Sequence, residues 1–169
     1  MMSELSSKKF YLLGTDYVFP RTANKVLKAF LKTKGVPDEN IIEEYTPFHH
    51  QDYQTIVGKI KAFAASGDAC VLSTINGDSN VPFYKEFANQ GLSSEDCPIM
   101  AFSVSEDELR AMDVPPLVGH LAAWNYFQSI KTKENIQFTR AFKTYCKEKG
   151  LPGGSKRVTC DPIEAAYFG

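Results

Sequence analysis

The sequence predicts an α/β protein built on a doubly wound parallel sheet. Short runs of β-branched and aromatic residues alternate along the chain with segments of helical periodicity. One such run, residues 69–74, is apolar at almost every position, as expected for a strand covered by helices on both faces. The length of 169 residues suits one domain, and 43% hydrophobic with 23% charged residues is an ordinary globular composition.

Five strands are expected in the main part of the chain. The first follows a polar N-terminal stretch and ends at Gly14, and the fifth ends at Trp124, the single tryptophan. The third is the apolar run described above. In chain order the strands cover residues 9–14, 40–45, 69–74, 98–102 and 117–124, and a further short strand is expected at 156–160.

The segments between these strands have helical patterns. The first predicted helix, 22–34, ends before Gly35 and places four apolar residues on one face: Val26, Leu27, Phe30 and Leu31. Later helices are expected to open at the capping residues Asp52, Ser79 or Asn80, Ser105 and Thr132. Because strands and helices alternate, right-handed crossovers give a Rossmann-like three-layer lobe.

The last expected helix opens at Asp161-Pro162-Ile163-Glu164, where Asp caps, Pro fits the first turn and Glu follows three residues after the cap. The chain ends barely two turns later, and a helix that short is marginal unless it is packed. We therefore expect this chain to be a piece of a longer protein.

Charge and cysteine content exclude several classes of protein. The formal net charge is -1, so a general nucleic-acid binder is not expected. No apolar run approaches the roughly 20 residues that span a bilayer. The four dispersed cysteines lack metal-ligand spacing, so no structural zinc site is expected, while their disulfide status stays open: Cys70, Cys97, Cys146 and Cys160. No other metal and no cofactor is expected.

Catalytic and nucleotide-binding motifs are incomplete. Gly14-Thr15-Asp16 lacks the later glycines of a dinucleotide fingerprint, and the bulky residues after it would obstruct a pyrophosphate. His49 and His50 are adjacent, so they rarely share one metal ion, and His120 is interpreted as a structural histidine. An α/β enzyme and a phosphoacceptor domain using Asp16 or Asp78 remain as distant alternatives.

Polar, uncharged side chains follow the strands of the predicted sheet. In parallel α/β sheets, ligands bind outside the carboxyl ends of the strands. The segments at those ends, 14–17, 73–78, 103–105 and 124–125, are rich in hydroxyl, amide and aromatic groups. This chemistry favours a small, polar and uncharged ligand.

Four segments together resemble a known family. They are residues 14–25 (Gly-Thr-Asp-Tyr-Val-Phe-Pro-Arg-Thr-Ala-Asn-Lys), 76–80 (Asn-Gly-Asp-Ser-Asn), 117–127 (Leu-Val-Gly-His-Leu-Ala-Ala-Trp-Asn-Tyr-Phe) and 157–167 (Arg-Val-Thr-Cys-Asp-Pro-Ile-Glu-Ala-Ala-Tyr). In this order they resemble the urea and short-chain-amide solute-binding proteins of ABC transporters, which are type I periplasmic binding proteins. The resemblance covers almost all of the chain from Lys8 onward.

The resemblance implies two α/β lobes that close on a solute at a hinged cleft. Residues 8–125 would form the second lobe, and residues 126–169 a crossover with part of the first lobe. It further implies a urea or amide importer, permease subunits as partners and a periplasmic or extracytoplasmic location, although no signal peptide is visible in this chain. A cytoplasmic amide sensor of the same fold and a branched-chain amino-acid binding protein are the alternatives.

Six residues are predicted to form this lobe's share of the solute site, from their place at strand ends and from their family positions. Direct or near contacts are expected from Tyr17, Thr74 and Ser103. Asn76 and Asp78 are weaker candidates that hold their loop, and Trp124 would form a cleft wall or hinge. Urea is small and neutral, so a dry site that pairs each of its polar groups would discriminate against analogues.

Overall fold

The computed structural model describes residues 6–154, which form two compact units. The larger unit comprises residues 6–104 and 108–123 of the described chain, and the smaller one comprises 105–107 and 124–154. The correspondence of these units to the predicted lobes, 8–125 and 126–169, stays a prediction. The expected strand at 156–160, the helix opening at Asp161 and Cys160 lie outside the described residues.

The larger unit is a five-stranded parallel sheet, which confirms the predicted fold class. Its strand order is β2-β1-β3-β4-β5. The strands are β1 (Lys9–Thr15), β2 (Ile41–Thr46), β3 (Ala69–Thr74), β4 (Ile99–Ala101) and β5 (Leu121–Ala122), and the helices are α1 (Val18–Thr33), α2 (Gln54–Ala64) and α3 (Asn80–Asn89). The short α4 (Glu106–Leu109) has residues in both units.

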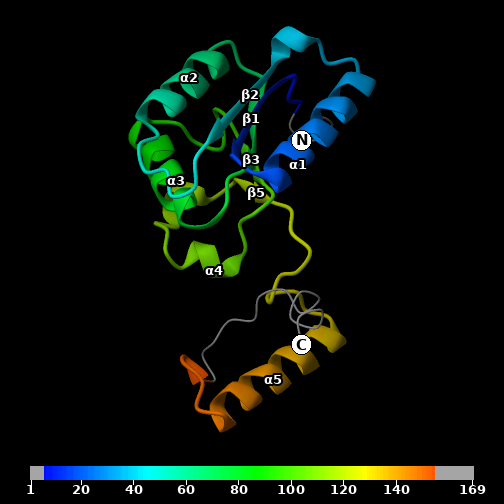
Figure 1. Ribbon diagram of the computed structural model, residues 1–169, viewed down its shortest axis with the longest axis vertical. Helices are drawn as coiled ribbons and strands as arrows, with labels where there is room; N and C mark the ends of the chain where they lie inside the picture. The colour runs from blue at the N-terminus through cyan, green and yellow to red at the C-terminus, as the bar shows by residue number, and fades with distance from the viewer. Residues whose placement is uncertain (1–5, 155–169) are drawn as a thin grey trace. The chain divides into compact units, whose positions relative to one another are not determined.

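Helices cover both faces of this sheet (Figure 1). On one face, α2 and α3 pack on alternate residues of the central strands, with Tyr11, Val57 and Phe83 fully buried. On the other face, Leu31 of α1 packs against Phe10 and further residues of β1 and β3. All six residues of β3 are buried, as its apolar run predicts.

Helix α1 differs from the prediction at its start and in its orientation. It begins four residues earlier than residue 22, because a proline in the first turn removes only an N–H group that has no partner inside the helix. The helix buries Pro20, Asn24 and Leu31, whereas Val26 and Phe30, predicted on the same inner face as Leu31, are exposed.

The fifth strand is much shorter than the predicted 117–124. Residues Pro115–Leu117 form a 3-10 turn, and Gly119 has a positive φ of 92° that L residues rarely adopt. The backbone N–H of His120 closes this turn on the Leu117 carbonyl oxygen at 3.1 Å. Extended pairing is therefore confined to Leu121–Ala122.

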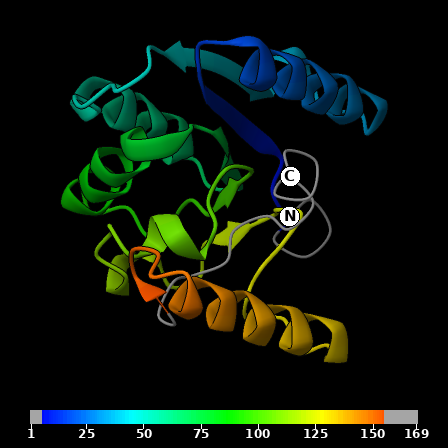
Figure 2. The same cartoon turned by 60° about the horizontal axis from the view of Figure 1, so that its bottom comes forward.

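The smaller unit contains α5 (Lys133–Glu148), close to the predicted 132–149 (Figure 2). Thr132 caps it as expected, since its hydroxyl oxygen accepts the backbone N–H of Asn135 at 3.2 Å. Within residues 6–154, no helix combines the length and apolar character needed to cross a bilayer.

Candidate functional site at the carboxyl edge of the sheet

Parallel register brings the ends of three strands to one edge of the sheet. Gly14 of β1 lies opposite Thr74 of β3, and Ser73 of β3 lies opposite Ala101 of β4. The segments that follow these residues therefore emerge side by side, at the edge where ligands of such sheets bind.

Two of the predicted residues, Tyr17 and Asn76, meet at this edge. The side-chain amide of Asn76 donates a hydrogen bond to the Tyr17 hydroxyl oxygen. The backbone N–H of Asn76 donates to the buried Thr15 hydroxyl oxygen at 3.0 Å. The loop after β3 is thus tied to the loop after β1 at two points, and both predicted side chains are half-buried.

An aromatic side chain that the sequence prediction missed adjoins Tyr17. The ring centroid of Phe48, in the loop after β2, lies 4.9 Å from that of Tyr17, with 39° between the ring planes. Phe48 is 52% exposed, and Phe19 of α1 lies on Tyr17 at a longer centroid distance of 6.2 Å. The sequence feature that could have indicated Phe48 as a site residue is its position two residues after β2, at the same edge of the sheet.

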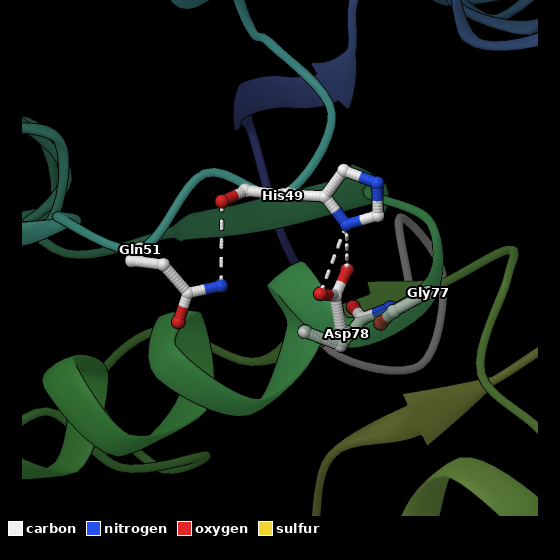
Figure 3. A network of polar contacts seen from close by, with 5 residues as sticks. His49, Gln51, Gly77 and Asp78 are labelled. Carbon is white, nitrogen blue, oxygen red and sulfur yellow. Dashed lines mark hydrogen bonds and ion pairs between the residues drawn. The ribbon is translucent and has the colours of Figure 1, made fainter.

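Asp78 is engaged by His49 from the loop after β2 (Figure 3). His49 Nδ1 lies 3.0 Å from both carboxylate oxygens of Asp78, and this hydrogen bond is the largest cause of the lowered Asp78 pKa. His49 has a positive φ of 60°, and the Gln51 side-chain amide donates to its carbonyl oxygen at 3.3 Å. The loops after β2 and β3 are therefore joined at the sheet edge.

In the loop after β1, Asp16 forms an ion pair with Arg21. The Arg21 guanidinium donates to Asp16 at 2.6 Å, and this hydrogen bond holds the Asp16 pKa below its usual range. Arg21 also lies over the Tyr45 ring, 4.5 Å from its centroid. Asp16 and Asp78 are thus engaged by different side chains, Arg21 and His49, so they do not form the shared acidic pocket of a phosphoacceptor site.

The other three predicted residues have different environments. Thr74 is fully buried, and its hydroxyl lies 3.2 Å from Asn24 Oδ1, toward α1. Ser103 follows β4 and is 7% exposed, and its hydroxyl oxygen is buried without a hydrogen-bond partner. Trp124 belongs to the smaller unit. A ligand-binding role for any of the six residues stays a prediction.

His120, Cys70 and Cys97 have structural environments. The Ile99 backbone N–H donates to His120 Nδ1 at 3.0 Å, and burial lowers the His120 pKa to about 4, as expected for a structural histidine. Cys70 and Cys97 are buried free thiols, and burial raises their pKa values to about 11 and about 12. Among the described residues, no group of His, Cys, Asp and Glu side chains could hold a metal ion.

A separate groove of about 360 Å³ lies beside α3. It is lined by residues of α3 and of the segment before β5, and none of the six predicted site residues is among them: Val81, Tyr84, Lys85, Ala88, Asn89, Ala111, Met112, Asp113 and Pro116. The sheet edge and this groove are thus two distinct places where a solute could contact the larger unit.

Comparison with known proteins identifies the fold. The family model described as a periplasmic binding protein domain matches residues 1–169. Similar solved structures include an amino acid ABC transporter substrate-binding protein from Pseudomonas fluorescens Pf-5, with 16% identity and a TM-score of 0.70 over 89% of this chain and 39% of that chain. A solute-binding protein from R. palustris in complex with 4-hydroxybenzoate has 19% identity and a TM-score of 0.70 over 85% of this chain and 38% of that one.

A third structure is a branched chain amino acid ABC transporter periplasmic ligand-binding protein from Burkholderia xenovorans LB400. It has 18% identity and a TM-score of 0.67, over 89% of this chain and 38% of that chain. At these identities the likeness shows the fold, which is that of solute-binding proteins. The chain spans about two-fifths of the length of each of these structures.

Proposed function

The chain belongs to the periplasmic binding protein domain family, and we propose that it supplies one lobe of the solute-binding component of an ABC importer. The solute is a small neutral amide, a class that includes urea and short-chain amides, held at the carboxyl edge of the sheet. In this proposal the protein works outside the cytoplasm, hands its solute to permease subunits and catalyses no reaction.

The observation that carries the proposal is the chemistry of the sheet edge. The Arg21 guanidinium is already engaged by Asp16, and the Asp78 carboxylate is already hydrogen-bonded to His49. The polar groups beside them are neutral: the Tyr17 hydroxyl and the Asn76 amide. A carboxylate solute would have to compete for a paired cation, whereas a neutral amide needs only donors and acceptors of this kind.

The buried Ser103 hydroxyl supports the same class of solute. A buried polar atom without a partner costs about 1–3 kcal/mol, so a solute that gained access to this enclosed oxygen would recover part of that free energy. Urea and simple amides carry both an acceptor oxygen and N–H donors. A hydroxyl group can donate a hydrogen bond to that oxygen or accept one from those N–H groups.

The experiment is an NMR titration of the ¹⁵N-labelled 169-residue chain with millimolar urea, acetamide, acetate and leucine. The proposal expects urea and acetamide to shift the amide resonances of Tyr17, Asn76 and Ser103, and acetate to leave them in place. If leucine or acetate shifts these resonances at lower concentration than either amide, the solute is a carboxylate and the proposed specificity is wrong.

A further inference from the structure

We propose that Phe48 determines specificity at this edge, by making the site prefer planar neutral amides that carry an aromatic substituent over urea itself. This inference rests on the proposed function, because it concerns the solute of the same site. Sequence patterns did not single out Phe48, and its role follows from its place between Tyr17 and the His49–Asp78 pair.

Contacts on both sides of Phe48 fix its position. Thr46, the last residue of β2, is buried, so the loop leaves the sheet from an anchored point. Immediately after Phe48, His49 is held by Asp78 from the neighbouring loop. The ring between these two points packs at 4.9 Å on Tyr17, a normal distance for a favourable aromatic pair.

Phe48 nevertheless leaves 52% of its surface in water. Its ring is apolar, and the hydroxyl and amide groups of Tyr17 and Asn76 lie beside it on the same edge. A ligand that covers this surface must therefore be flat and apolar at one end and able to form hydrogen bonds at the other. Urea has the second property but no apolar part, whereas benzamide has both.

The charged residues of these loops limit the charge that the ligand can carry. The Arg21 guanidinium is bonded to Asp16, and the Asp78 carboxylate is hydrogen-bonded to His49. A carboxylate such as benzoate would have to displace Asp16 from Arg21 to gain a counter-ion, and a carboxamide would not. The expected ligand class is therefore an aromatic or heteroaromatic carboxamide.

The test compares acetamide, benzamide and benzoate by NMR titration of the 169-residue chain, with the Tyr17 and Asn76 amide resonances as the readout. One aromatic contact contributes about 0.5–1.5 kcal/mol, so benzamide should bind about 2–12-fold more tightly than acetamide. Phe48→Ala should bring that ratio close to one, and Phe48→Tyr should retain it. Phe19→Ala, which changes an exposed aromatic residue at the longer distance from Tyr17, is the matched control and should also retain it.

The outcomes separate this inference from the function on which it rests. If acetamide binds at the edge as tightly as benzamide, or if the ratio survives Phe48→Ala in a variant whose spectrum shows a native fold, the inference is overturned and the amide site stands. If benzoate binds more tightly than benzamide, the neutral class is wrong. If no amide shifts these resonances, the proposed function itself fails.

Discussion

Replacing Gly14 with alanine would test the packing that positions the end of β1. A Cβ atom at Gly14 would lie 2.8 Å from the Pro20 Cβ and closer still to the Thr74 hydroxyl, which is itself fully buried. Neither neighbour can swing away, since proline is a ring within α1 and Thr74 is enclosed beside Asn24. Overpacking of this kind costs typically 1–3 kcal/mol, and we expect about 2–3 kcal/mol from two clashes.

Chemical denaturation of Gly14→Ala, followed by circular dichroism, measures this loss of unfolding free energy. The matched control is Gly58→Ala in the interior of α2, where the nearest atom to a new Cβ is 3.8 Å away. That variant should gain roughly 0.5–1 kcal/mol from helix propensity. The double change Gly14→Ala with Thr74→Ala should recover part of the loss. Equal stabilities of the Gly14 and Gly58 variants would refute the close packing of α1 on β1.

Three further predictions concern titration, thiol reactivity and the edge hydrogen bond. Because the His120 pKa is about 4 in the folded chain and about 6.5 when unfolded, the unfolded state binds more protons between these values. The unfolding free energy should therefore fall by about 1–2 kcal/mol as pH drops from 7 to 4.5, a figure that allows for the partial exposure of the His120 side chain. His120→Gln should remove most of this pH dependence of the unfolding free energy. Cys70 and Cys97 should resist maleimide labelling at pH 8 until denaturant is added, since burial keeps both thiols protonated; peptide mass spectrometry showing native labelling within minutes would contradict this. Tyr17→Phe should weaken acetamide binding about 2–10-fold by removing the hydroxyl that bonds to Asn76, and an unchanged NMR affinity would exclude this hydroxyl from the site.

Local sequence patterns predicted the buried strands and most helix positions well. The run 69–74 forms β3 with the predicted bounds, because burial on both faces requires a continuous apolar sequence. Thr132 likewise marks the start of α5, because capping depends on residues within one turn. The predicted first helix begins too late because the prediction does not treat Pro20 as a first-turn residue. The fifth strand was too long because the turn at Gly119 depends on local backbone geometry.

The candidate site was predictable only in part. Strand-end position was enough to select Tyr17 and Asn76, which the structure brings into contact. Phe48 and His49 were missed as site neighbours because they follow β2, and their meeting with the other loops depends on the strand order β2-β1-β3. The sequence alone also does not predict the direction of the Thr74 side chain, because that direction depends on how closely α1 approaches Gly14.

The most direct test of a neutral-amide site at the carboxyl edge is an intermolecular NOE experiment on the labelled chain with benzamide. The account predicts NOEs from the benzamide protons to the rings of Tyr17 and Phe48 and to the side chain of Ser103. NOEs to Tyr84 and Met112 instead would place the ligand in the groove beside α3 and would contradict it.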